Sequence, residues 1–177
     1  NLRNLISLVD ISRAYFNANI NRTVYVELPP EAGAPPGSVG VLEKCMYGTR
    51  DAAQGWETAY CTALKRLGLV RGIASPCLFI HPTRNVKVCV HGDDFLSVGS
   101  KADNEWFRSG LLQEFEGKLK GVLKAAGDEV RVLNRILRRT AAGYEWEADQ
   151  RHGEIIVREL GLTEDSKELT VPGRKLT

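Results

Sequence analysis

The feature that most constrains the fold is a pair of adjacent aspartates, Asp93-Asp94, set between two apolar segments. Residues 86–90 and 95–98 are rich in side chains that favour strands, and His91-Gly92 completes the short gap between them. This pattern predicts a β-hairpin with the aspartates in its turn. Ordinary turn chemistry is one explanation, because Asp and Gly favour turns for local reasons. Two like charges beside apolar strands are costly, however, and also favour a compensating cation.

Apolar periodicity elsewhere predicts a mixed fold. Residues 5–9 form a short apolar run that is typical of a buried strand and delivers Asp10 at its end. Residues 51–67 and 101–115 have apolar side chains at helical spacing. Further strands are expected at residues 23–28, 77–81, 129–137 and 144–146, and a short helix at 153–160. This order predicts an α+β fold, a ferredoxin-like split β-α-β sheet with both helices on one face and the other face free for a ligand or a duplex.

Composition excludes several classes of protein. Hydrophobic residues make up 43% of the chain and charged residues 26%, which is ordinary globular usage and argues against disorder. There is no apolar run of about 18 residues and no signal peptide, so we expect a soluble, intracellular protein with no membrane partner. Four cysteines without a CxxC pair predict reduced, structural thiols. The first residue is Asn1, and we expect a piece of a longer polyprotein.

Asp10 gives the paired aspartates a third carboxylate. If the strand at residues 5–10 lies beside the hairpin at 86–98, Asp10 and the turn meet at one end of the sheet. Three carboxylates there could hold two magnesium ions about 3.5–4 Å apart, which is an arrangement for phosphoryl transfer. The alternative is that Asp10 is a solvated residue at a strand end.

The ordered motifs resemble those of copia-type retrotransposon reverse transcriptases. Residues 8–18, which include Asp10, resemble the first catalytic motif, and residues 42–56 resemble the second. The third is Val90-His91-Gly92-Asp93-Asp94-Phe95-Leu96, in which His91 stands where the family usually has Tyr. Residues 115–119 are similar to the motif that follows the catalytic hairpin, and residues 133–136 to the segment near the primer grip. The resemblance spans nearly the whole chain.

The resemblance implies a fold and a domain organisation. It implies a reverse-transcriptase palm over residues 1–137, with incomplete fingers, followed by a strand and helix extension over residues 138–177 towards the thumb or connection. It implies an RNA-directed DNA polymerase that works with a DNA primer on template RNA or DNA, with deoxynucleoside triphosphates, and with the rest of the Pol polyprotein (fingers, thumb and ribonuclease H). The expected location is the cytoplasm, in virus-like particles, or the nucleus.

The resemblance also implies residue roles. Asp10, Asp93 and Asp94 are implied as catalytic ligands of two Mg²⁺ ions. The implied substrate contacts are Ile11, Tyr15 beneath the nucleotide sugar, and Gln54, and Lys118 is implied as the proton donor to the leaving pyrophosphate.

Each of these roles has a structural alternative. Tyr15 can be a core aromatic, Gln54 a residue on the exposed side of its helix, and Lys118 a solvated charge. Trp56 and Tyr47 are interpreted as packing residues. The basic residues Arg135, Arg138 and Arg139 either contact the nucleic-acid backbone or line a solvated strand edge.

Two other functions compete with the polymerase. One is an inactive retroelement remnant that acts at most as a nucleic-acid-binding or structural domain. The other is an unrelated RNA-recognition module, which predicts paired aromatic stacking platforms on the central strands. The central strands offer Phe79 without such a pair.

Overall fold

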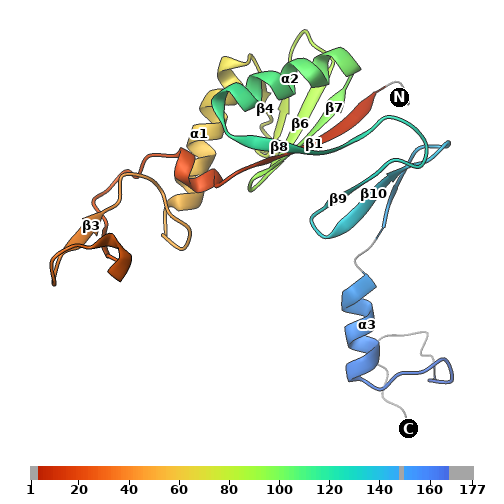
Figure 1. Cartoon of the computed structure of the whole chain (residues 1–177). Coiled ribbons are helices and arrows are strands. Elements are labelled where there is room, and N and C mark those ends of the chain that lie inside the picture. The colour runs from red at the N-terminus through yellow and green to blue at the C-terminus, as the bar shows by residue number, and fades with distance from the viewer. Residues whose placement is uncertain (1–3, 148–149, 168–177) are drawn as a thin grey trace.

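A computed structural model of the chain describes residues 4–147 and 150–167. Its largest element is an antiparallel sheet of six strands in the order β4-β5-β6-β7-β1-β8 (Figure 1). In that order the strands are β4 (Val70–Arg71), β5 (Leu78–Ile80), β6 (Val86–His91), β7 (Asp94–Gly99), β1 (Leu5–Ile11) and β8 (Gly117–Leu123). The predicted hairpins at residues 77–98 and the strand at 5–10 are confirmed, and the fold is α+β.

Two helices cover one face of this sheet (Figure 1). They are α1 (Ala52–Arg66) and α2 (Lys101–Glu114), close to the predicted ranges. Their apolar sides join the sheet in a core that includes Trp56, Phe95 and Phe107. β1 is buried at most positions because both of its faces are covered, with Val9 and Ile11 in the helix-side core. This explains why β1 is a continuous apolar run rather than an alternating one.

A second, three-stranded sheet packs against the opposite face. It has the order β11-β10-β9, with β9 (Glu129–Val132), β10 (Arg135–Arg139) and β11 (Tyr144–Trp146). Val130, Val132 and Leu137 of this small sheet form a second core with Ile6 and Leu8 of β1. The expectation that the face opposite the helices is free is therefore wrong for the part around β1 and β8.

The prediction of one strand over residues 129–137 is also wrong. Leu133 and Asn134 have φ values of 50° and 61°, and they make a tight turn between β9 and β10. Two consecutive positive φ values are typical of a two-residue hairpin turn. The strand that follows α2 in the large sheet is instead β8, which pairs with β1 and was not predicted.

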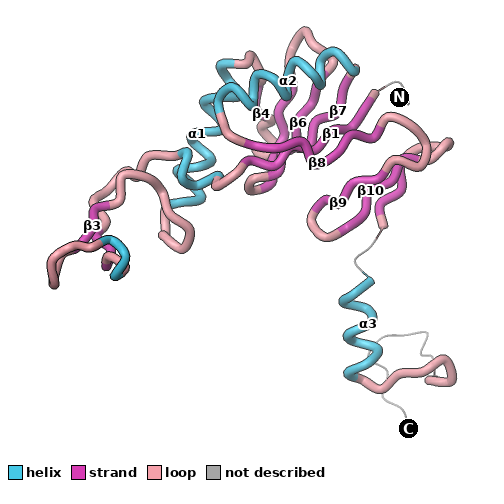
Figure 2. The backbone as a smooth tube through the Cα atoms, viewed as in Figure 1, coloured by secondary structure: helices cyan, strands magenta, loops and turns pink. Residues whose placement is uncertain are grey.

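Two further segments project from this body (Figure 1). β2 (Tyr25–Glu27) and β3 (Val39–Val41) pair as a separate ribbon, so the strand expected at 23–28 is shorter and β3 is additional. At the other end, α3 (Gln150–Glu159) begins three residues before the predicted helix. The short helices η1 (Ala14–Asn17) and η2 (Pro30–Ala32) lie in the long connections between β1 and β3, drawn mostly as loop in Figure 2.

The predicted domain division at residue 137 falls inside β10, which pairs with both β9 and β11. Residues 148–149 and 168–177 of the predicted extension lie outside the described residues. Within the described part of the chain, none of the helices has the length and apolar character needed to cross a membrane.

Candidate active site

Strand register brings Asp10 and Asp94 together. The two residues are directly paired between β1 and β7, next to the buried pair Val9 and Phe95. Asp93 precedes Asp94 in the turn, and its carbonyl accepts a hydrogen bond from the Ile11 N–H at 2.9 Å. The three aspartates therefore lie at the same end of the large sheet. Asp10 and Asp94 share the sheet face opposite the helices, because side chains alternate along each strand.

Trp56, in the core between the large sheet and its helices, contacts the turn that carries the aspartates. This side chain is 2% exposed and packs edge-on against Tyr60, Phe95 and Phe115. Its indole Nε1–H donates a 2.8 Å hydrogen bond to the carbonyl of Gly92, the residue just before Asp93. The interpretation of Trp56 as a packing residue is confirmed, and its hydrogen bond to the turn is an addition that its apolar neighbours did not indicate. Tyr47, interpreted in the same way, is 50% exposed and contacts Tyr15 and Phe16 with only part of its ring surface.

Lys120 supplies a cation between the two carboxylates. Its Nζ lies 2.5 Å from Asp10 Oδ1 and 3.0 Å from Asp94 Oδ1. Burial lowers the pKa of Lys120, but the hydrogen bonds to Asp10 and Asp94 outweigh burial and raise this pKa above its ordinary value. A side chain of the protein itself thus supplies a cation to Asp94 of the predicted Asp93-Asp94 pair, and to Asp10.

Sequence reasoning missed Lys120. A register shift opposite Leu8 and Val9 leaves Lys120 as the extra residue of a β-bulge in β8. A bulge interrupts the alternation of apolar and polar residues by which strands are recognised. In addition, β8 pairs with β1, which lies far from it in the sequence. The available signal was the spacing of Lys118 and Lys120, since residues two apart in a strand share a face.

The Asp10 and Asp94 carboxylates have the donor chemistry that magnesium prefers. Both side chains direct an oxygen to one point, where the Lys120 ammonium lies, and hard carboxylate oxygens are the usual protein ligands of Mg²⁺. Asp93 is exposed in the turn. Among residues 4–147 and 150–167, no three Asp, Glu, His or Cys side chains are grouped closely enough to hold a metal ion. The structure thus provides a converging pair of carboxylates, and Asp93, the third predicted ligand, lies next to Asp94 in the chain.

The other predicted site residues lie at different distances from this pair. Lys118 is 71% exposed, and its Nζ is 4.0 Å from Asp10 Oδ2. The side chain of Ile11 is buried in the helix-side core. Tyr15 is half-buried in η1, and its ring centroid is 4.5 Å from that of Tyr47. Gln54 is exposed in the first turn of α1.

Gln54 lines a separate cavity of about 540 Å³ beside α1, together with Asn17, Asp51 and Thr58. The structure therefore brings Asp10, Asp94 and Lys118 together, whereas Gln54 lines a different cavity from the one beside the carboxylate pair.

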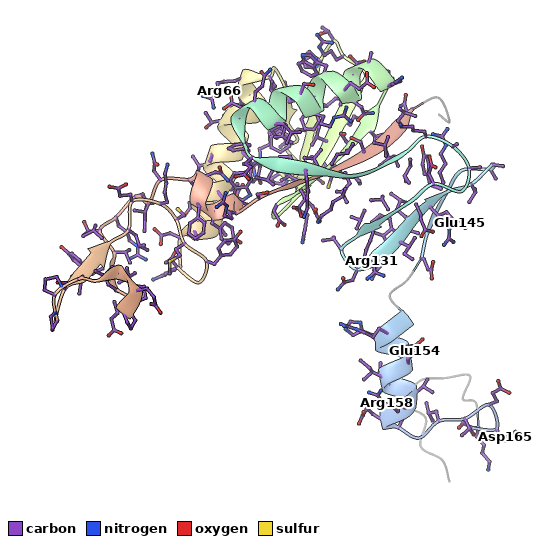
Figure 3. The ribbon with its side chains drawn as sticks, in the orientation of Figure 1. Arg66, Arg131, Glu145, Glu154, Arg158 and Asp165 are labelled. Atoms are coloured by element: carbon purple, nitrogen blue, oxygen red, sulfur yellow. The ribbon has the colours of Figure 1, made fainter. Side chains whose placement is uncertain are left out.

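A second cavity, of about 490 Å³, adjoins the carboxylate pair. Its lining includes Asp94 and Lys120 from the large sheet and Glu129, Arg131 and Asn134 from the β9–β10 hairpin. Arg131 projects from this hairpin in Figure 3. The cavity thus has both acidic and basic groups within reach of a charged ligand at the aspartates.

The three arginines of the predicted basic cluster, Arg135, Arg138 and Arg139, have different environments in the structure. Arg139 is 8% exposed, and its guanidinium donates to the carbonyls of Leu123 and Asn4. Arg138 forms ion pairs with Glu129 and Glu147. These two arginines hold the small sheet together and join it to the large one, so the expectation that they contact nucleic acid or line a solvated edge is wrong for Arg139. Arg135 is exposed.

The chain thus has a six-stranded sheet covered by two helices on one face, with Asp10 and Asp94 paired at the end of two neighbouring strands. The family model described as Reverse transcriptase (RNA-dependent DNA polymerase) matches residues 3–172, and the chain belongs to this family. This membership excludes the interpretation as an unrelated RNA-recognition module. Similar proteins from Ty1 transposons confirm the likeness to copia-type retrotransposon enzymes.

Two similar proteins come from Saccharomyces cerevisiae. They are the Truncated transposon Ty1-A Gag-Pol polyprotein and the Transposon Ty1-DR5 Gag-Pol polyprotein. Each is 29% identical to this chain over 92 residues, which is 51% of the chain. The matched part is 7% of the first relative and 5% of the second, so the chain corresponds to a small portion of much longer polyproteins.

Proposed function

We propose that this chain is the palm of an RNA-directed DNA polymerase of a copia-type retrotransposon, which adds nucleotides to a primer 3′-hydroxyl by two-metal transfer. The observation that carries the proposal is the direct pairing of Asp10 with Asp94 between β1 and β7. The strand order β6-β7-β1-β8, with α1 before β6 and α2 before β8, supports a split β-α-β palm. Family membership supports the same activity.

In this proposal Asp10 and Asp94 hold magnesium, with Asp93 completing the ligand set from the turn. Bound magnesium would neutralise phosphate charge and activate the primer hydroxyl. The protein's own contribution is to hold the carboxylates in place. Strand pairing orients Asp10 and Asp94, and the Trp56 hydrogen bond to Gly92 fixes the turn. Such preorganised charge is a large term in phosphoryl transfer.

The remaining roles are proposed from the resemblance. Lys118, 4.0 Å from Asp10, would give its proton to the leaving pyrophosphate. Tyr15 follows β1 closely in η1 and would lie beneath the nucleotide sugar. Ile11 would lie beside the nucleotide next to Asp10, with its side chain in the core. Gln54, at the start of α1, would contact the incoming nucleotide.

The proposed partners are a DNA primer on template RNA or DNA, deoxynucleoside triphosphates, and the fingers, thumb and ribonuclease H of a Pol polyprotein. The last of these is supported by the relatives, which are Gag-Pol polyproteins. The proposed place of action is the cytoplasm, inside virus-like particles, or the nucleus. We propose residues 1–137 as the palm with incomplete fingers and the rest as an extension towards the thumb or connection.

The test is magnesium-dependent extension of a DNA primer on an RNA template. The wild-type chain is compared with an Asp93→Asn, Asp94→Asn double variant and with Glu31→Gln, an exposed acidic residue in η2 that serves as the matched control. We expect extension by the wild type and the control, and loss of extension in the double variant.

Two results would contradict the proposal. Extension that survives in the double variant refutes the role of the paired aspartates. No extension by a folded wild-type chain supports the second candidate, an inactive remnant that acts at most as a nucleic-acid-binding or structural domain. The lack of a three-ligand group among residues 4–147 and 150–167 is the observation that favours this candidate. Filter binding of the primer–template then distinguishes a remnant that binds nucleic acid from one that is only a structural domain.

A further inference from the structure

Lys120 occupies the position where the two carboxylates converge. Its ammonium contacts Asp10 at 2.5 Å and Asp94 at 3.0 Å, while the side chains of these aspartates are only 16% and 14% exposed. One ammonium shared by two shielded carboxylates contacts an oxygen of each and offsets one of their two negative charges. A divalent cation that binds the same oxygens must therefore remove Lys120 from them.

The backbone of β8 favours this position for Lys120 over its neighbour Lys118. Lys118 lies opposite Asp10 in the regular ladder, yet it is 71% exposed and its Nζ reaches one carboxylate at 4.0 Å. Lys120 is 35% exposed and contacts both carboxylates, because the bulge opposite Leu8 and Val9 shifts β8 at this point. The two lysines thus have the same charge and chain length but unequal contact with the aspartates.

We propose that Lys120 is the counter-ion of the Asp10–Asp94 pair in the metal-free protein and competes with divalent cations for these carboxylates. This inference rests on the metal site of the proposed function and adds a positioning residue to it. Lys120 holds the carboxylates at a common point before a cation arrives, and it weakens the cation's binding. Once displaced, its ammonium lies beside the cavity shared with Arg131, where it can meet anionic phosphate oxygens.

Titration of the folded chain with Mn²⁺, followed by the loss of the free-ion electron paramagnetic resonance signal, measures this competition. The variants are Lys120→Met, which removes the charge at similar length, Lys120→Arg, which keeps it, and Lys118→Met as the matched control. Two partly exposed ion pairs are lost in Lys120→Met, so we expect its Mn²⁺ affinity to rise about three- to tenfold. Lys118→Met should change the affinity by less than about twofold, and Lys120→Arg should stay near the wild type.

Thermal unfolding provides a readout that does not depend on activity. Without metal, Lys120→Met should unfold at a lower temperature than Lys118→Met, because it leaves two shielded carboxylates side by side. Saturating Mn²⁺ should raise the unfolding temperature of Lys120→Met more than that of the wild type. If Lys120→Met fails to fold by circular dichroism, Lys120→Gln takes its place.

The outcomes separate this inference from the proposed function. Equal Mn²⁺ affinity in Lys120→Met and Lys118→Met overturns the competition while the metal site stands. Mn²⁺ binding that is unchanged in Asp10→Asn overturns the metal site itself. No Mn²⁺ binding by Lys120→Met also overturns the competition, because removal of the competing ammonium should expose the site.

Discussion

The hydrogen bond from Trp56 to the aspartate turn can be tested with Trp56→Phe. This change removes the indole donor to the Gly92 carbonyl and part of a ring that is 2% exposed. The lost core atoms cost about 1 kcal/mol, and the lost hydrogen bond about 1 kcal/mol. We therefore expect the free energy of unfolding to fall by about 2 kcal/mol, and the unfolding temperature by about 4–8 °C for a chain of this size. Urea denaturation followed by circular dichroism measures the first quantity.

The effect of Trp56→Phe on the aspartate turn itself can be measured at one backbone amide, that of Ile11. The Ile11 N–H donates to the carbonyl of Asp93, so its hydrogen-exchange rate reports on the turn. Phe107→Leu is the matched control, because Phe107 is fully buried in the same core but lies on α2. At equal loss of global stability, the Ile11 amide should exchange faster in Trp56→Phe than in Phe107→Leu. Equal exchange in the two variants, or a loss well below 1 kcal/mol in Trp56→Phe, would refute the reasoning.

Two further predictions concern buried polar groups. Burial raises the pKa of Tyr60 to about 12, whereas the unfolded chain ionises it near 10. Folding thus favours the neutral phenol, and stability should fall as the pH rises from about 10 to about 12. Urea denaturation over this range should show a smaller fall in Tyr60→Phe, and an equal fall would contradict the assignment. Asn104, 3% exposed, accepts from Ser97 at 2.6 Å and donates to the carbonyls of Leu5 and Gly99. Asn104→Leu leaves these groups without their partner and should cost about 2–4 kcal/mol by urea denaturation, while a cost below about 1 kcal/mol would show that they find other partners.

The elements with local signals were predicted well. The helices α1 and α2 have apolar residues at regular helical spacing, and the strands β5, β6 and β7 are separated by short turns rich in Gly, Asp, Asn and Pro. The pairing of Asp10 with Asp94 was also within reach, because each residue comes at the end of an apolar strand and only the adjacency of the two strands had to be assumed.

The elements that escaped prediction lack such local signals. Four of the seven residues of β8 are glycine or lysine, and its bulge interrupts the alternation. The turn between β9 and β10 places a leucine, Leu133, at positive φ, which is an uncommon choice for that conformation. Lys120 could be assigned to the aspartates only after the partner of β1 was known. Tertiary pairing, rather than propensity, decided these elements.

The pairing of β1 with β8 also sets the order of events during synthesis. Asp10 lies opposite Lys118, so the ribosome must add the intervening residues before the two strands can meet. At ordinary elongation rates this takes roughly 5–20 s. Throughout that interval β1 is an apolar strand with an open edge, which favours pairing with the wrong chain. The carboxylate end of the sheet is therefore completed late, and a chaperone that covers β1 on the nascent chain should increase the yield of folded protein.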